Sequence, residues 1–254
     1  MSRNFELLSQ LGRIQEILQK PEAVPSVLSE EPPIESLVPT TTIAVQGSAR
    51  EEVIKLARNL FFVPGAGAPH RVVFAGTESG AGCSWICSHA AEILATQVRG
   101  SVCLVDCNLR APTLHQRLGA PNHHGLSDTL LGSGSVRQYV HRLSQPNLYL
   151  LSSGSVKEVE QALLASDSMR SRAAELYSQF DYVLFDVAAL STCNDGIVLG
   201  RFADGVVLVL RANSSRRETA LKAVEDLKAA KVEALGAVLN QRTFPIPDAI
   251  YKYL

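Results

Sequence analysis

A glycine loop in the first third of the chain carries the first residues whose types and spacing could do chemistry. Gly76, Gly80 and Gly82 follow a β-branched apolar run and precede a helical stretch. Glycines at this spacing let a backbone approach a ligand closely, and the helix behind them offers free N–H groups and the positive end of its dipole. Ser84 takes the position of a hydroxyl that binds magnesium. The loop therefore predicts a binding site for phosphate groups.

Two aspartates end two further apolar runs. Asp106 ends "SVCLVD" and Asp186 ends "DYVLFD". Carboxylates at strand ends that face a glycine loop suit magnesium binding and the positioning of water. Either aspartate alone would more often only cap a turn, but the combination with the loop favours a magnesium–nucleotide site. The rival, a dinucleotide loop of the form G-x-G-x-x-G, does not fit "GTESGAG".

The loop lacks the lysine that a phosphate-binding loop of this kind carries. Cys83 occupies that position, and no lysine occurs between Lys55 and Lys157. Glu78 adds a negative charge to the loop. Such a lysine delivers a point charge to the β- and γ-phosphates, and charge stabilisation is most of phosphoryl-transfer catalysis. The sequence thus predicts a phosphate site with a weakened ability to turn over its ligand.

Six short, β-branched apolar runs must position these residues. They lie at 71–76, 101–106, 147–152, 181–186, 205–210 and 235–240, with helical stretches at 84–97, 156–178 and 215–230. Such runs are typical of strands buried on both faces of a parallel sheet, and repeated β–α units predict a doubly wound, mostly parallel α/β domain. Ligands of these folds bind at the carboxyl ends of the strands. The residues expected there are the glycine loop, Asp106, Asp186, Arg211 and Asn240.

The first 42 residues have a different character. Apolar residues recur at spacings of three or four over residues 1–20, which predicts an amphipathic helix that docks on its own domain or on a partner. Five prolines within residues 21–42 predict an extended linker. We therefore expect an N-terminal helix (1–20), a Pro-rich linker (21–42) and one domain (43–254).

Composition excludes several classes of protein. A formal net charge of −1 gives no global basic field for nucleic acid. We find no apolar run of the length of a membrane span, about 18 residues, and no secretory signal, so we expect no direct membrane insertion. Five cysteines in a chain of 254 residues do not predict a disulfide scaffold and favour a reducing cytoplasm.

From about residue 40 onward the chain resembles the cytoplasmic domain of bacterial (BY-type) tyrosine kinases, which belong to the ParA/MinD-like P-loop ATPases. The segments that carry the resemblance follow the family's order: "EEVIKLARNLFF", "ESGAGCS", "VCLVDCNLRAPTLHQRLG", "GLSDTLLG", "NLYLLSSG", "FDYVLFDVAAL", "DGVVLVLRANSSRRETALKAVEDL" and "LGAVLN". The resemblance implies a P-loop NTPase-like fold and a role in capsule or exopolysaccharide systems.

The resemblance also implies roles for particular residues. Those implied to hold the nucleotide are Gly80, Ala81, Gly82, Cys83, Ser84 and Trp85, with Asn240 near the adenine. Magnesium would be held by Ser84, Asp106 and Asp186, and the catalytic set would be Asp106, Asp186 and Arg110. Glu52, Lys55 and Arg58 take the places of the family's oligomerisation motif E-x-x-R-x-x-R. Tyr251 and Tyr253 are candidate phosphorylation sites, although such a pair more often only packs. The implied cofactor is Mg-ATP or Mg-ADP.

The chain departs from the family mainly at charged positions. Cys83 replaces the loop lysine, Asn108 replaces an aspartate, and the stretch 77–79 lacks a second signature lysine. Trp85 replaces a small residue, and Val187–Ala189 replace a T-P-P sequence. Losing two or three charged contacts of about 2–4 kcal/mol each would slow turnover by several orders of magnitude.

We therefore expect a degenerate kinase-like protein with weak or no ATP turnover, acting as a regulator or scaffold in exopolysaccharide or capsule synthesis and export. Its expected partners are a transmembrane chain-length regulator or export protein and further copies of the chain, without nucleic acid. Its expected location is cytoplasmic, peripheral to the inner membrane through that partner.

Three alternatives stay open. The chain could be an active autokinase that completes its site in an oligomer, with a cation from Arg110, Arg211 or Arg216. It could be a partition-type ATPase that positions cargo. Cys83, Cys87, Cys103 and Cys107 could instead form a metal or redox site, and Cys83 at a helix N-terminus predicts a thiol of lowered pKa.

Overall fold

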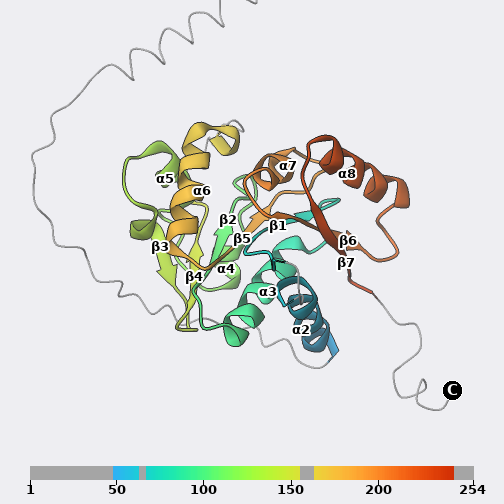
Figure 1. Ribbon diagram of the computed structural model, residues 1–254, viewed down its shortest axis with the longest axis horizontal. Coiled ribbons are helices and arrows are strands. Elements are labelled where there is room, and N and C mark those ends of the chain that lie inside the picture. The colour runs from blue at the N-terminus through green and yellow to red at the C-terminus, as the bar shows by residue number, and fades with distance from the viewer. Residues whose placement is uncertain (1–47, 63–66, 155–162, 243–254) are drawn as a thin grey trace, which may run out of the picture. The chain divides into compact units, whose positions relative to one another are not determined.

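The computed structural model describes residues 48–62, 67–154 and 163–242 (Figure 1). The predicted N-terminal helix over 1–20, the linker over 21–42, and Tyr251 and Tyr253 lie outside the described residues. The described chain forms one α/β layer structure in which helices cover both faces of a sheet.

The sheet has seven strands in the order β3-β4-β2-β5-β1-β6-β7 within the described part of the chain. Their bounds are β1 Arg71–Gly76, β2 Val102–Asp106, β3 Val140–Arg142, β4 Leu148–Leu151, β5 Tyr182–Val187, β6 Gly205–Arg211 and β7 Ala234–Asn240. All neighbouring pairs are parallel except β3 with β4, which is antiparallel. The predicted doubly wound, mostly parallel sheet is confirmed, and the six predicted runs are strands.

Helices lie on both faces of this sheet (Figure 1). The α-helices are α2 Ser48–Phe61, α3 Cys83–Gln97, α4 Leu114–Arg117, α5 Leu126–Leu131, α6 Asp167–Gln179, α7 Asp195–Gly200 and α8 Arg217–Ala229, and the 3-10 turns are η1 Val136–Tyr139 and η2 Leu163–Ala165. The side chains of α2, α3 and α4 share one core with alternate residues of the strands. Those of α5 to α8 share a second core with the intervening strand residues. This alternation explains why the strands read as continuous apolar runs.

One predicted helical stretch needs adjustment, and one strand was not predicted. The stretch predicted as one helix over 156–178 consists, from residue 163 onward, of the turn η2 followed by α6, and residues 155–162 are outside the description. Ser166 separates the two because its hydroxyl accepts a hydrogen bond from the Met169 N–H, at 3.2 Å, and caps α6. The antiparallel edge strand β3 was not predicted, since three residues carry little periodic signal.

Strand β7 was predicted to be buried on both faces, and this is wrong. It is an edge strand with alternately exposed and half-buried side chains, and Leu239 is 59% exposed. Its apolar sequence is the same kind of run as that of the central strands, so composition alone could not distinguish an edge from a centre. The exposed apolar strand is therefore a feature that needs its own explanation.

Candidate functional site

The glycine loop joins the end of β1 to the N-terminus of α3. Gly80 and Gly82 have left-handed backbones, with φ of +81° and +83°. Gly82 is the N-cap of α3, and its carbonyl accepts the Ile86 N–H at 3.0 Å. The left-handed residues turn the chain so that a helix of 15 residues points its N-terminus at the loop. The predicted arrangement for binding an anion is thus present.

Two amides at the end of β7 hold this loop from the outside. The Asn240 amide donates to the Ala81 carbonyl at 2.9 Å, and the Gln241 amide donates to the Gly80 carbonyl at 3.0 Å. Asn240 was expected near an adenine, and the structure brings it to the loop itself. Gln241 was not predicted, because its role depends on a left-handed backbone, φ +57°, that a sequence pattern does not show.

A pair of glycine substitutions tests how this contact supports the loop. Alanine at either Gly80 or Gly82 would sit in a left-handed backbone, which costs about 1–2 kcal/mol. A Cβ on Gly80 meets no atom within 4 Å, whereas one on Gly82 collides with the Asn240 amide. We expect Gly82→Ala to lower the free energy of unfolding by about 1 kcal/mol more than Gly80→Ala, because it also breaks the Asn240 hydrogen bond. Urea unfolding of both variants measures the difference, and equal losses would contradict a structural role for that bond.

Asp106 and Asp186 lie side by side at the carboxyl ends of β2 and β5. They are direct neighbours in the register of the two strands, and both are fully buried. Asp106 accepts the Asn108 and Leu114 N–H groups, at 3.2 and 3.1 Å. Within the described residues, neither carboxyl oxygen of Asp186 has a partner at full hydrogen-bond geometry, although the Ser84 hydroxyl and the Cys83 thiol lie close enough to affect its pKa. Buried polar oxygens are rarely left without a partner, so Asp186 points to a missing ligand.

Burial and proximity raise the pKa of both carboxyls. Desolvation and the neighbouring charge of Asp186 raise the pKa of Asp106 to about 7, although its backbone hydrogen bonds oppose this. Desolvation raises the pKa of Asp186 to about 6, while the Ser84 hydroxyl, the Cys83 thiol and the charge of Arg117 lower it. A cation between the two would relieve both effects.

These residues fit a magnesium ion. The donors are two carboxylates and the Ser84 hydroxyl, which lies near enough to Asp186 to influence its pKa. Oxygen ligands of this kind, few in number and beside a phosphate site, are typical of magnesium, which keeps several waters. The structure thus brings Ser84, Asp106 and Asp186 together as the sequence predicted, around oxygens that lack a partner.

The cysteines do not form a site of their own. Cys83 and Cys87 pack in the core on the α3 side of the sheet, whereas Cys103 and Cys107 pack in the core on the opposite side. No group of three His, Cys, Asp or Glu among the described residues is placed to hold a metal ion. The prediction of a lowered pKa for Cys83 is wrong, because burial and the charge of Asp186 raise the pKa of its thiol well above the ordinary value.

The arginines proposed as substitute cations take different positions. Arg110 lines a cleft of about 420 Å³ with Thr192 and Cys193, and the Thr192 hydroxyl lies 3.3 Å from that of Ser79 in the loop. Arg110, Arg211 and Arg216 are all exposed, but Arg211 and Arg216 do not line this cleft. Arg110 is therefore the predicted arginine that the structure brings to the edge of the site.

Arg117 is a cation that the sequence did not single out. It ends α4, is half-buried, and its Nε is buried without a hydrogen-bond partner in the described chain. Its charge lowers the pKa of Asp186. Its position depends on how α4 folds back after β2, where the Leu114 N–H is bound by Asp106. No local spacing in the sequence indicates that fold-back.

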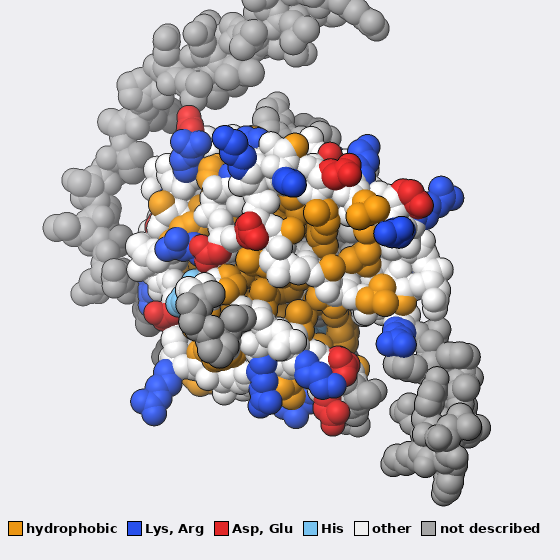
Figure 2. Space-filling model, turned by 45° about the vertical axis from the view of Figure 1, so that its right-hand side comes forward, with side chains coloured by type: hydrophobic (Ala, Val, Ile, Leu, Met, Phe, Trp, Pro, Cys, Tyr) orange, Lys and Arg blue, Asp and Glu red, His pale blue; other side chains and the backbone are white. Residues whose placement is uncertain are grey.

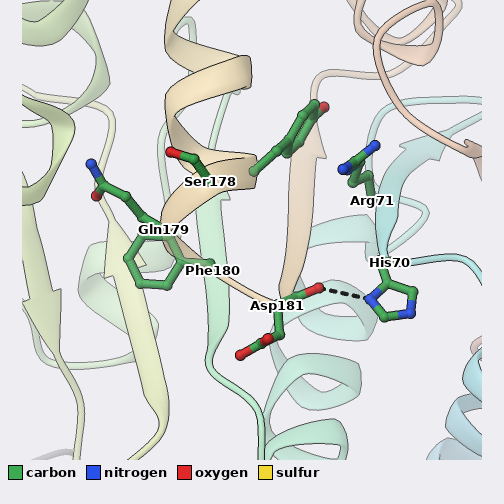
Figure 3. Close-up of a pocket in the computed structure, with 7 residues that line it drawn as sticks. His70, Arg71, Ser178, Gln179, Phe180 and Asp181 are labelled. Carbon is green, nitrogen blue, oxygen red and sulfur yellow. Dashed lines mark hydrogen bonds between the residues drawn. The ribbon is translucent and has the colours of Figure 1, made fainter.

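A second cleft lies at the opposite edge of the sheet, at the start of β1 and β5. It has a volume of about 300 Å³ and is lined by His70, Arg71, Tyr177, Ser178, Gln179, Phe180 and Asp181. Figure 3 shows the His70 ring beside Asp181, whose backbone carbonyl lies 2.8 Å from its Nδ1. Arg71 begins β1 and Gly76 ends it, so the length of the strand separates this cleft from the glycine loop. Ligands of parallel sheets bind at the loop end, which favours the loop as the functional site.

Comparison with known proteins gives relatives of one kind. No protein-family model matches the chain. It is 35% identical over 161 residues to tyrosine-protein kinase YwqD of Bacillus subtilis (strain 168), and the aligned region covers 63% of this chain and 68% of that protein. It is 31% identical over 169 residues to the putative tyrosine-protein kinase EpsB of Ralstonia nicotianae, and here the aligned region covers 66% of this chain and 22% of that protein. The chain thus spans about two thirds of one relative and less than a quarter of the other.

Solved structures share the fold. The chimerical protein CapA2B2 superposes with a TM-score of 0.73 at 24% identity, covering 80% of this chain and 88% of that chain. The kinase domain of Escherichia coli tyrosine kinase ETK superposes with a TM-score of 0.68 at 22% identity, covering 91% and 90%. A plasmid partition protein from Borrelia burgdorferi has a TM-score of 0.51 at 14% identity, covering 72% and 87%. The chimerical protein and the ETK kinase domain are thus nearer in fold than the partition protein.

Proposed function

Because this chain belongs to the bacterial tyrosine-protein kinase family, we propose that it is a degenerate member with weak or no ATP turnover. It would act as a regulator or scaffold in the synthesis and export of exopolysaccharide or capsule. The observation that carries this proposal is Cys83, a neutral, half-buried thiol beside Asp186 at the position of the loop lysine.

The remaining residues support nucleotide binding better than catalysis. The N–H groups of the loop and of the first turn of α3 would bind phosphates, because backbone amides alone can cradle an anion. Ser84, Asp106 and Asp186 would hold Mg²⁺, which would neutralise part of the phosphate charge. Transfer of a phosphoryl group needs further positive charge where charge develops, and each such contact supplies about 2–4 kcal/mol. We propose that the absence of the lysine leaves binding weak and turnover slower still.

Contacts of helix α2 support the scaffold part of the proposal. One face of α2 is buried against α3, and Glu52, Lys55 and Arg58 lie exposed on the other. Lys55 and Glu52 form an ion pair at 2.7 Å with side chains 64% and 69% exposed, so solvent screens the pair and it contributes little to folding. A face that the fold does not need can bind other copies of the chain or a transmembrane chain-length regulator or export protein.

The proposed location is cytoplasmic, at the inner membrane through that partner. Among the described helices, none is both long and apolar enough to cross a bilayer.

A turnover assay tests the proposal. The full chain is incubated with Mg-ATP, and ADP formation and phosphotyrosine are measured beside nucleotide binding by calorimetry. We expect binding that is weak or absent, with no ADP above that of an Asp186→Asn variant and no phosphotyrosine. Hydrolysis that depends on Asp186 would contradict a degenerate site.

One observation favours a second candidate, an active autokinase. Arg110 lies in the cleft beside the loop, and Arg117 lies near enough to Asp186 to lower its pKa, so a guanidinium could replace the lysine. Phosphotyrosine at Tyr251 or Tyr253 after incubation with ATP would support this candidate instead of the first.

A further inference from the structure

A groove beside the phosphate loop runs between α2, the start of α3 and the exposed strand β7. It has a volume of about 720 Å³, and its apolar lining includes Leu56, Trp85, Ile86, Val238 and Leu239. Leu56, Trp85 and Val238 are only half-buried and pack against the edge of the core on the α3 side. Figure 2 shows hydrophobic side chains gathered in a band across the face that it presents. Apolar surface of this kind on an edge strand is a binding site or a liability.

The described chain ends at this groove. Arg242, the last described residue, is part of its lining, directly after β7. Twelve residues, 243–254, follow with the sequence "TFPIPDAIYKYL". Fully extended, they would span up to about 40 Å, whereas α2 with its 14 residues is only about 21 Å long. Every part of the groove is therefore within reach of this segment.

The composition of the segment suits the groove. It contains no glycine or serine, and its large aromatic and aliphatic residues are Phe244, Ile246, Ile250, Tyr251, Tyr253 and Leu254. Prolines at 245 and 247 favour an extended backbone, in which Phe244 and Ile246 project to the same side. An extended segment with one apolar side complements an apolar groove beside an edge strand.

We propose that residues 243–254 fold back within the same chain and occupy this groove, with Phe244 and Ile246 against Trp85 and Leu239. The groove and the phosphate loop share Trp85, Asn240 and the first turn of α3. A segment bound in the groove would therefore lie beside Asn240, whose side-chain amide holds the loop. The segment also carries Tyr251 and Tyr253, so docking would hold both tyrosines close to the α/β domain. The proposal stands whether or not the loop binds nucleotide.

Trp85 provides a native reporter for the test. It is the single tryptophan of the 254 residues, so the tryptophan fluorescence of the full chain comes from one side chain in the groove. All samples are kept free of nucleotide, because Trp85 also borders the phosphate loop. The His89 ring stacks on Trp85 with centroids 4.2 Å apart, so all variants are measured at one pH. The full chain is compared with Phe244→Ser/Ile246→Ser on the segment and with Leu239→Ser on the groove. Asp248→Asn, a polar change within the segment, is the matched control.

We expect the segment variant and the groove variant each to move Trp85 emission to longer wavelength and to raise its quenching by acrylamide, while the control leaves both unchanged. Leu239 is 59% exposed, so its replacement should leave the fold intact, which circular dichroism checks. Unchanged Trp85 emission and quenching in the segment variant would overturn the proposal. A blue-shifted emission in the wild type that is lost on dilution would also overturn it, because the occupant would then come from a second copy.

Discussion

Replacing Cys83 with lysine should raise the affinity of the chain for Mg-ATP by about 10- to 1,000-fold. A positive charge at a phosphate contributes about 2–4 kcal/mol where water is excluded, and each 1.4 kcal/mol is a factor of ten. Cys83 begins α3 beside Asp186, and its thiol is held neutral because burial and the charge of Asp186 raise its pKa. A lysine at this position would extend from the first residue of α3 toward phosphates bound at the loop. Calorimetry with Mg-ATP and Mg-ADP on both proteins measures the change.

The matched control is Cys83→Met, which adds length without charge. If the gain comes from charge, the methionine variant binds no more tightly than the wild type, and the gain of the lysine variant falls as salt rises. A lysine variant that binds no better would show that the loop is closed to phosphate for another reason, such as the half-buried Trp85 two residues further along α3. Tight binding by the wild type would contradict the proposal of a weakened site directly.

The sequence predictions were accurate where a feature depends on neighbouring residues and failed where it depends on distant parts of the fold. Strands β1, β2, β4, β5 and β6 were predicted from short, β-branched apolar runs, which are typical of strands buried on both faces. Strand β7 has the same composition but lies at an edge, and only the order of the strands decides that. An edge position is a tertiary property, so no local pattern could show it.

The candidate site divides in the same way. Asp106 and Asp186 were predicted to meet because parallel strands bring their carboxyl ends to one edge, and the register makes them direct neighbours. A lowered pKa of the Cys83 thiol was predicted from the helix dipole alone. That prediction failed because burial and the charge of Asp186 raise this pKa by more than the dipole lowers it. Arg117 and Gln241 were missed because each reaches the site through a turn whose course depends on distant contacts.

The buried pair of aspartates should make the protein less stable as pH rises through neutrality. The pKa of Asp106 is about 7 and that of Asp186 about 6 in the folded chain, against an ordinary value of 3.8. The folded state therefore binds more protons than the unfolded state between about pH 4 and pH 7, and the free energy of unfolding falls over that range. The stability that protonation provides is complete below about pH 4 and is lost above the folded pKa values. At 1.36 kcal/mol per pH unit, Asp186 alone accounts for roughly 3 kcal/mol.

Asp186→Asn should remove the share of this dependence that comes from Asp186, and it should lessen the share of Asp106, whose pKa the Asp186 charge helps to raise. The amide carries no charge, like the protonated carboxyl that a raised pKa favours at low pH, so the variant should match the wild type near pH 4.5. At pH 8 it should be more stable by roughly 2–3 kcal/mol, because no charge is buried. Urea unfolding at pH 4.5, 6 and 8 measures both values, with Asp226→Asn on the exposed side of α8 as the control that leaves the dependence unchanged.

Magnesium gives the same experiment a second readout. A cation that binds only the folded chain stabilises it by mass action. Millimolar Mg²⁺ should therefore raise the stability of the wild type at pH 8 and leave Asp186→Asn unaffected. If the variant loses stability at pH 8 instead, the Asp186 carboxylate has a partner that outweighs its burial, and the pair is a structural feature of the fold. If it gains stability while Mg²⁺ acts on the wild type alone, the two carboxylates are held at a cost in folding that a bound cation offsets.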